Sequence, residues 1–455
     1  MKRNIEERML AWKQDTERKV LLVRGARQVG KTYSIRELGK TFHRFVEVNL
    51  EENRDIHVFF RDSLDPARLC EKLAAYFSTP IIPGETLLFL DEMQACPESI
   101  VALRFFHEKM PGLHVVGAGS LLEFALAEIP SLGVGRLSSL FMYPLTFDEF
   151  LPAMGEESLL GVVEQADALR PIDEPFHRRL VDLVRSYQLV GGMPAAVRAY
   201  AKTHDLQKCF KVLDDLVTTL EDDFKKYKRR APVGRLGEVF RSIVLQAGAK
   251  FKYSNVDSAS SVHTLKDALL LLVQAGLAHR VVHTHARGIP LGAQVDEKKF
   301  KVLLFDVGIH QRLLGLDMPS HLTAGEVELV NRGSLAEVFA GLELIGNHPS
   351  HVRPSLHYWH REARGSTAEV DYVIQQGGDI VPVEVKAGTK GQMQSMRRFM
   401  DERNLRRGIR LSLENFAAYD RIRVVPLYAI RRLVGPRTVA NPPGSSRARV
   451  VVSGK

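Results

Sequence analysis

Gly25-Ala26-Arg27-Gln28-Val29-Gly30-Lys31-Thr32 is the stretch of sequence that decides the fold of the first domain. It fits the pattern G-x-x-x-x-G-K-[ST] without a mismatch, and it follows an apolar run at 20–23 that predicts a strand. The two glycines let the chain curl so that successive backbone N–H groups face a phosphate, and the helix that follows adds its positive end. We expect all eight residues to contact a nucleotide, with Lys31 at the β- and γ-phosphates and the Thr32 hydroxyl on Mg²⁺.

Two acidic residues end a second apolar run, at 87–90. A carboxylate at the end of a buried strand is costly unless it holds a cation, so Asp91 is the expected partner of Mg²⁺. Glu92 is then expected to polarise the attacking water as general base. The alternative is that both acids only form a turn at the end of the strand.

Two further residues are candidates for contact with the nucleotide. Ser120 follows the apolar run 114–117, at the position of a residue that contacts the γ-phosphate or the water; the alternative is that it caps the next helix. Arg136 is a candidate for charge on the γ-phosphate of its own or a neighbouring subunit. An arginine with a surface or structural role is the alternative.

Short apolar runs alternate with helical patterns over residues 1–150, which predicts an α/β fold with a three-layer parallel sheet. Residues 151–230 have helical periodicity and are expected to form a lid or connector. Residues 231–298 have the pattern of a winged helix, and 299–433 that of another mixed α/β domain. The Pro-, Gly- and Ser-rich end, 434–455, is expected to be a disordered tail.

The stretches 24–32, 89–94, 119–123 and 143–150 together resemble a prokaryotic AAA+-related P-loop ATPase family. Members of that family carry a C-terminal domain of unknown function, and the resemblance covers most of the chain. It implies ATP as the nucleotide and ATP hydrolysis as the activity. Tyr33 departs from the family pattern, which has a second small hydroxyl residue there, but the chemistry of the motif does not depend on it.

A second constellation lies near the C-terminus. Asp371 lies in an apolar run, and Glu384 and Lys386 are two residues apart on the next one, hence on one face of a strand. This arrangement suits metal-dependent phosphodiester hydrolysis: Asp371 and Glu384 would hold Mg²⁺, and Lys386 would position water or stabilise developing charge. Glu337, on a helical run at 334–339, is a candidate third carboxylate.

These residues, with Tyr358-Trp359 before them and Ala387-Gly388 after them, resemble the PD-(D/E)xK nuclease superfamily of restriction enzymes and archaeal junction resolvases. The resemblance implies a restriction-endonuclease-like α/β domain, a mixed sheet flanked by helices. It also implies catalysis by Glu337, Asp371, Glu384 and Lys386. The alternative is a retained fold without cleavage, in which the E-x-K pair is only an ion pair.

The winged-helix segment contains a helical run, 261–273, with His263 and Lys266 on its outer face. Such a helix can enter the major groove of DNA, although winged helices also dock proteins. His283 and His285 form an HxH pair without a third ligand nearby in sequence, so we expect ordinary exposed side chains there.

Composition sets only loose limits on function. The chain has 63 basic and 54 acidic residues, a net charge of +9, which is compatible with a polyanionic partner but identifies none. Three cysteines far apart predict no disulfide framework and favour the cytoplasm. We expect no signal peptide and no membrane span.

The sequence thus predicts a Mg²⁺-dependent ATPase associated with DNA, with a possible Mg²⁺-dependent deoxyribonuclease at its C-terminal end. The alternative is a nucleotide-dependent switch whose winged helix and inactive nuclease-like fold only bind a DNA or protein partner. A ring-like homo-oligomer and a monomer are both open.

Overall fold

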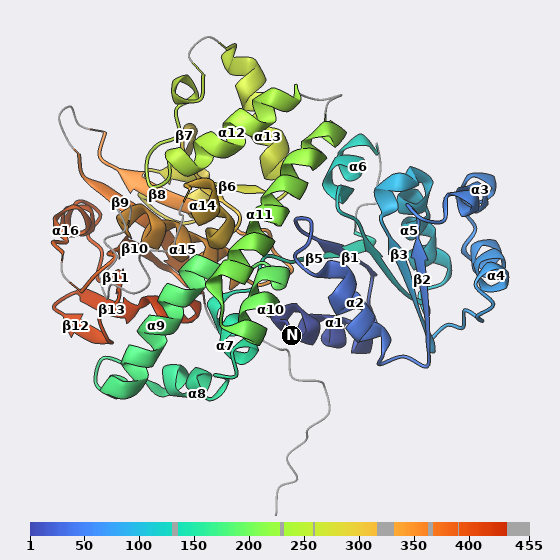
Figure 1. Cartoon of the computed structure of the whole chain (residues 1–455), viewed down its shortest axis with the longest axis horizontal. Helices are drawn as coiled ribbons and strands as arrows, with labels where there is room; N and C mark the ends of the chain where they lie inside the picture. Colours follow the sequence, from blue (N-terminus) through green and yellow to red (C-terminus); the bar gives the residue numbers. More distant parts are fainter. Residues whose placement is uncertain are drawn as a thin grey trace, which may run out of the picture.

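The computed structural model describes residues 1–129, 135–227, 232–257, 260–315, 332–362, 367–389 and 391–434. It contains two sheets in separate lobes, with a group of helices between and beneath them (Figure 1). Of the predicted tail, only Val434 lies within the described residues. Among the described helices, none is both long and apolar enough to cross a membrane.

The first lobe is built on five parallel strands in the order β2-β3-β4-β1-β5. Its strands are β1 (Val20–Arg24), β2 (Arg44–Asn49), β3 (Thr86–Asp91), β4 (His114–Ala118) and β5 (Leu137–Phe141). Its helices are α1 (Asn4–Gln14), α2 (Lys31–Gly39), η1 (Arg54–Ile56), α3 (His57–Asp62), α4 (Pro66–Tyr76), η2 (Met93–Ala95), α5 (Pro97–Lys109) and α6 (Leu122–Glu128). The predicted α/β architecture with a parallel sheet is confirmed.

Apolar residues on both faces of the strands explain this sheet. All six residues of β3 are buried, as in a strand covered by helices on both sides. Successive side chains point to opposite faces, so Leu87 and Phe89 join one core while Leu88 and Leu90 join another. The acids that follow therefore emerge at the carboxyl edge of the sheet.

The connecting helices follow the first lobe, as the periodicity of 151–230 predicts. They are α7 (Phe147–Ala153), α8 (Ser158–Gln165), α9 (Glu174–Val190), α10 (Pro194–Thr203), α11 (Leu206–Asp223) and η3 (Phe224–Tyr227). Figure 1 shows α7, α10 and α11 lying between the two sheets. The buried faces of α9 and α11 belong to the larger apolar core, which also includes residues of both sheets.

The second sheet has eight strands in the order β12-β13-β11-β10-β9-β8-β6-β7. They are β6 (Ala278–Thr284), β7 (Val295–Leu304), β8 (Leu356–His360), β9 (Glu369–Gln376), β10 (Asp379–Val385), β11 (Gly408–Ser412), β12 (Ala417–Tyr419) and β13 (Ile422–Pro426). The helices of this lobe are α12 (Val233–Leu245), η4 (Tyr253–Asn255), α13 (Val262–Gln274), η5 (Leu291–Gln294), α14 (Val307–Leu313), α15 (Arg332–Gly346), α16 (Gln394–Glu402) and η6 (Leu427–Leu433).

This sheet joins two segments that the sequence predicts as separate domains. β6 and β7 pair antiparallel after two helices, in the element order of a winged helix, but β6 also pairs parallel with β8. The boundary predicted at 298/299 lies inside β7. The mixed sheet of the C-terminal segment is present, while the winged-helix and nuclease-like assignments stay predictions.

Candidate functional site

The phosphate-binding loop lies between β1 and α2, at the carboxyl edge of the first sheet. Gly30 precedes the helix with φ 101°, and Gly25 has φ 148°. A Cβ atom added at Gly25 would lie 2.1 Å from the carbonyl oxygen of Met142. Both glycines are therefore required: Gly25 by its close backbone contact, and Gly30 by its left-handed conformation.

Lys31 is buried inside this loop. Its Nζ donates to the carbonyl oxygens of Gly25 and Ala26, at 2.9 and 2.7 Å. Desolvation lowers the pKa of Lys31 to about 8, against the attraction of Glu92 and Asp91. The ammonium is thus held in the loop by carbonyl dipoles, which an incoming phosphate can replace.

Thr32, in the first turn of α2, and Asp91, at the end of β3, come together. The Thr32 hydroxyl donates to Asp91 Oδ2 at 2.9 Å. Burial raises the pKa of Asp91, because the carboxylate is taken out of water with Glu92 nearby. A hydroxyl and a buried carboxylate side by side are oxygen ligands of the kind that Mg²⁺ prefers, so these two residues fit the predicted magnesium site.

Glu92 is held by donors from two other segments. The N–H and hydroxyl of Ser120 donate to Glu92 Oε2 at 3.0 and 2.9 Å, and Gln94 Nε2 donates to the same oxygen at 2.5 Å. Desolvation works to raise the pKa of Glu92, but these hydrogen bonds and Lys31 outweigh it and lower the pKa. Ser120 therefore binds the predicted general base, and it is not the N-cap of α6, which is Leu121.

A cavity of about 700 Å³ opens over these groups. Residues from the loop, from β3 and from α10 line it: Met1, Arg3, Arg27, Gln28, Gly30, Lys31, Thr32, Tyr33, Asp91, Glu92, Ser120, Leu145, Pro194, Ala195 and Arg198. Arg27 also makes a close ion pair with Asp223 at the end of α11. Three of the predicted loop residues do not line the cavity: Gly25, Ala26 and Val29. Val29 is fully buried.

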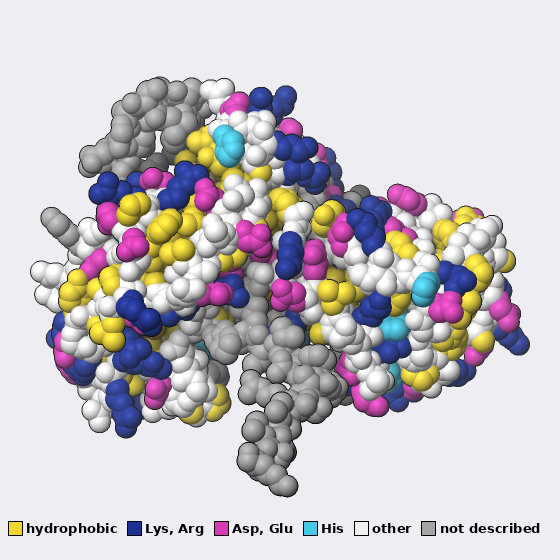
Figure 2. Space-filling model, turned by 90° about the horizontal axis from the view of Figure 1, so that it is seen from below, with side chains coloured by type: hydrophobic (Ala, Val, Ile, Leu, Met, Phe, Trp, Pro, Cys, Tyr) yellow, Lys and Arg dark blue, Asp and Glu magenta, His cyan; other side chains and the backbone are white. Residues whose placement is uncertain are grey.

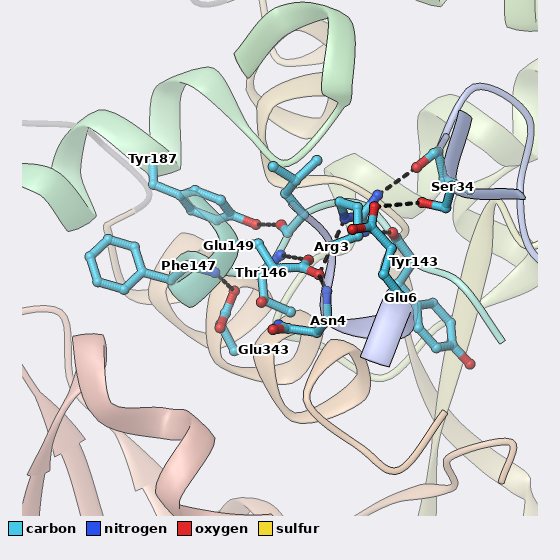
Figure 3. Close-up of polar contacts among 12 residues, drawn as sticks. Arg3, Asn4, Glu6, Ser34, Tyr143, Thr146, Phe147, Glu149, Tyr187 and Glu343 are labelled. Carbon is cyan, nitrogen blue, oxygen red and sulfur yellow. Dashed lines mark hydrogen bonds and ion pairs between the residues drawn. The ribbon is translucent and has the colours of Figure 1, made fainter. Parts of the chain in front are cut away.

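Arg3 anchors the far side of the loop, and Figure 3 shows it at the centre of a polar cluster. Its Nη1 donates to the carbonyl of Val29 and its Nη2 to the carbonyl of Tyr143, both at 2.7 Å. Arg3 Nε also lies 3.2 Å from a carboxylate oxygen of Glu149, which accepts the N–H of Asn4 at 2.6 Å. This buried guanidinium ties the start of the chain to the loop and to the connecting helices.

Arg136 lies elsewhere. It is next to Leu137, which pairs with Val20 at the start of β1, whereas the phosphate-binding loop follows the end of β1. Its guanidinium makes a close ion pair with Glu108 of α5. The prediction of a contact with the γ-phosphate of the same subunit is wrong, because Arg136 lies at the amino edge of the sheet; a contact in a neighbouring subunit stays a prediction.

The four predicted C-terminal residues lie in one region, on α15, β9 and β10. Asp371 Oδ2 accepts the N–H of Val385 at 2.8 Å, and Lys386 Nζ lies 2.9 Å from Glu384 Oε1. Burial raises the pKa of Glu384 to about 7, and repulsion by Asp371 adds to this effect. The E-x-K pair is thus an ion pair.

Sequence reasoning missed a fifth member of this cluster, Lys301 of β7. Its Nζ lies 2.7 Å from Glu337 Oε1 and 2.6 Å from Glu369 Oε1, and its side chain is 1% exposed. Desolvation works to lower the pKa of Lys301, but the attraction of Glu337, Glu369 and Asp371 raises it. A built-in ammonium therefore pairs with Glu337, the candidate third carboxylate, and with Glu369, which the sequence does not assign to the site.

The C-terminal carboxylates do not form a compact group of three ligand atoms. Within the described residues, the one group of three His, Cys, Asp or Glu ligand atoms that lie within 4.8 Å of one another is His283, His285 and Glu362. Glu337, Asp371 and Glu384 do not form such a group. The predicted metal site, held by Asp371 and Glu384 with Glu337 as a candidate third carboxylate, therefore stays a prediction.

Three segments of the chain match protein families. Residues 17–151 match a family described as an AAA domain, 181–320 a domain of unknown function (DUF8612), and 332–430 a domain of unknown function (DUF4143). The first part of the chain, which carries the P-loop motif, is thus similar to AAA domains. A search of curated proteins finds no match.

Solved structures give distant matches. The Walker-type ATPase PABY2304 of Pyrococcus abyssi is 15% identical, with a TM-score of 0.44 over 69% of this chain and 95% of that one. The Aeropyrum pernix ORC1 protein, solved in complex with DNA, is 15% identical, with a TM-score of 0.29 over 69% and 92%. Cdc6p from Pyrobaculum aerophilum is 11% identical, with a TM-score of 0.25 over 69% and 95%.

Two arginines that line the cavity, Arg3 and Arg198, were not predicted from the sequence. Arg3 has no local signal, because its partners are backbone carbonyls distant in sequence. Arg198 lies on α10, four residues after Pro194 in the stretch Gly191-Gly192-Met193-Pro194. That turn signal marks the beginning of α10, but only the packing of α10 brings Arg198 to the cavity.

Replacing Lys301 by Met tests the built-in counter-charge. Without the ammonium, the raised pKa of buried Glu337 rises further, so the folded state of Lys301→Met loses stability as pH increases through that pKa. We expect a loss within about 1 kcal/mol at pH 6 and about 3–5 kcal/mol at pH 9, measured by urea unfolding. The double variant Lys301→Met/Glu337→Gln should regain most of the loss at pH 9. An equal loss at both pH values would contradict the argument.

Proposed function

We propose that this chain binds ATP with Mg²⁺ in the cavity above the P-loop and hydrolyses it. The hydrogen bond between Thr32 and Asp91 carries the proposal, because it joins the end of the loop to a buried carboxylate on another strand. The match of 17–151 to the AAA domain family supports it. So does the cavity, whose volume of about 700 Å³ has room for a nucleotide.

In this proposal each group of the loop has one task. Backbone N–H groups of 25–32 bind the phosphates, and Lys31 exchanges the carbonyls of Gly25 and Ala26 for phosphate oxygens. Thr32 and Asp91 would hold Mg²⁺, which neutralises charge on the β- and γ-phosphates. Arg198, exposed on the wall of the cavity, supplies a further positive charge.

Glu92 takes the proton of the attacking water. Three donors to its Oε2 lower its basicity in the state described here. Release of Glu92 from Ser120 and Gln94 would turn a tightly held carboxylate into an effective base. We propose that this release accompanies the arrival of ATP, so that hydrolysis follows binding.

Glu92→Gln is the first test. The variant keeps the size of the side chain but cannot accept a proton, so we expect kcat for ATP to fall by about 10²–10⁴-fold while the Kd stays within about threefold of wild type. Glu98→Gln, which changes a surface carboxylate paired with Arg61, is the matched control and should hydrolyse ATP at the normal rate.

Lys31→Ala should lose ATP binding. Unchanged binding in that variant would contradict the site itself.

The pKa of Lys31 gives a second test. Because it is about 8 before ATP binds, the ammonium that the phosphates need is lost as pH rises above 8, and affinity falls. We expect the Kd for Mg²⁺·ATP to weaken about tenfold between pH 7 and pH 9, measured by calorimetry. Lys31→Arg stays charged, so its Kd, though weaker, should not change over this range. A wild-type Kd independent of pH would refute this assignment.

We also propose that the C-terminal lobe responds to the nucleotide without cleaving nucleic acid. The ion pairs Lys301–Glu337 and Lys386–Glu384 support this reading over a nuclease, because the cations that neutralise the carboxylates belong to the chain. Contacts between the P-loop and later parts of the chain support a response to the nucleotide. Arg27 pairs with Asp223 of α11, and a Cβ at Gly276 would lie 3.2 Å from the backbone N of Ala26.

The partner of this lobe is proposed from the surface of α13. Val262, Lys266 and Leu270 are exposed at intervals of four residues, and His263 lies 3.5 Å from Asp267. A helix surface of this composition favours a protein partner over phosphates. On the face of the molecule seen from below in Figure 2, basic and acidic side chains are also interspersed. DNA association, oligomerisation and a cytoplasmic location stay predictions.

A cleavage assay separates the switch from the nuclease. We expect no cleavage of single- or double-stranded DNA with Mg²⁺ or Mn²⁺, with or without ATP, because the carboxylates already have a counter-charge. Agarose and denaturing gels with wild type and Lys386→Ala give the readout. Cleavage by wild type that Lys386→Ala abolishes would overturn the proposal and restore the nuclease.

A further inference from the structure

The ends of β6 and β8 bring together three residues that could bind a cation and have no role in the proposed ATPase. β6 ends at Thr284, between His283 and His285, and β8 ends at His360, two residues before Glu362. The two strands are parallel neighbours, with His283 opposite Tyr358. Their carboxyl ends therefore meet at one edge of the sheet, and the third ligand missing from the local sequence comes from the other strand.

The ligand atoms converge in the way that a small cation requires. One ring nitrogen of His283, one of His285 and one carboxylate oxygen of Glu362 lie within 4.8 Å of one another. The His285 Nδ1 is 3.9 Å from Glu362 Oε2, and the rings of His283 and His285 have centroids 5.2 Å apart. Atoms at these separations can close to ligand distances of about 2.0–2.2 Å around one Zn²⁺ by side-chain rotation.

His283 supplies an independent reason to place a ligand here. It is 1% exposed, and its Nδ1 has no hydrogen-bond partner among the described residues. Its Nε2 lies 3.3 Å from the carbonyl oxygen of His360. An imidazole that donates from one nitrogen to a backbone carbonyl presents a lone pair on the other, which is the usual arrangement of a metal-binding histidine. Without an ion, a buried polar atom would stay unsatisfied.

Solvent access does not oppose binding. His285 and Glu362 are 39% and 46% exposed, which leaves a path for an ion from solvent. The three cysteines are buried elsewhere, so softer ligands do not compete.

Lys299 is the group that a cation has to displace. Its ammonium contacts Glu362 closely and also lies 3.2 Å from Asp296. The side chain is 39% exposed, so it can leave Glu362 and keep its contact with Asp296. Lys299 therefore weakens metal binding by direct competition for one ligand.

We propose that His283, His285 and Glu362 form a site for a borderline divalent transition-metal ion of the Zn²⁺ class. Two imidazoles and a carboxylate are a ligand set that Zn²⁺ accepts, with a fourth position open. The ion would link the segment matched by 181–320 to the one matched by 332–430. It holds the ends of β6 and β8 together and stabilises the sheet independently of ATP.

The test is calorimetric titration of metal-free, full-length protein with Zn²⁺, without ATP or Mg²⁺, together with thermal unfolding. We expect about one equivalent of Zn²⁺ to bind and to raise Tm. His285→Ala and Glu362→Gln should weaken binding at least about tenfold. Lys299→Gln should tighten it by about three- to tenfold, because the competing charge is gone.

His263→Ala is the matched control, since His263 is an exposed histidine on α13 and, among the residues that the structure describes, belongs to no group of three converging ligands. This variant should bind Zn²⁺ as wild type does. Zn²⁺ binding that His285→Ala leaves unchanged, or no saturable binding in the wild type, would overturn the proposal. Circular dichroism of each variant verifies folding, so that a lost site is distinguished from a lost fold.

Discussion

Buried carboxylates of the second lobe accept backbone N–H groups of the connecting helices, and the geometry of the cavity above the P-loop depends on these contacts. Asp306 accepts the N–H of Gly192 at 2.7 Å and that of Ile309 at 2.9 Å, and burial raises its pKa to about 6. Glu343 of α15 accepts the N–H of Phe147 at 2.9 Å (Figure 3). A buried carboxylate is costly unless its oxygens are satisfied, so these contacts tolerate little displacement.

The hydrogen bond between Gly192 and Asp306 affects the cavity because it holds the chain next to α10. Gly192 lies directly before the turn at which α10 begins, and α10 carries Pro194 and Arg198 to the wall of the cavity. Gly191 is held as closely, since a Cβ there would lie 2.4 Å from Asp306 Oδ1. Part of the wall of the cavity above the P-loop is therefore positioned by an acid from the second lobe. This connection gives a physical basis for a response of one lobe to a ligand in the other.

The two carboxylate centres of the chain solve the same electrostatic problem differently. Asp91 is buried beside a hydroxyl, and Lys31 nearby is engaged with loop carbonyls, so a cation from solution can meet the acid. Glu337 is buried against the ammonium of Lys301. The first arrangement is suited to binding a nucleotide with its metal, and the second is suited to stabilising a fold.

The sequence by itself determined the P-loop, the parallel sheet around it and the acids Asp91 and Glu92. These features depend on backbone conformation and on residues next to each other in the chain, which the order of amino acids fixes directly. Only the tertiary structure decided which side chains surround these groups. It brings Ser120 to Glu92, Arg136 to Glu108, Lys301 to the C-terminal acids and Glu362 to two histidines. Each of these contacts joins residues distant in sequence, because strand order and helix packing bring them together, and no local pattern carries that information.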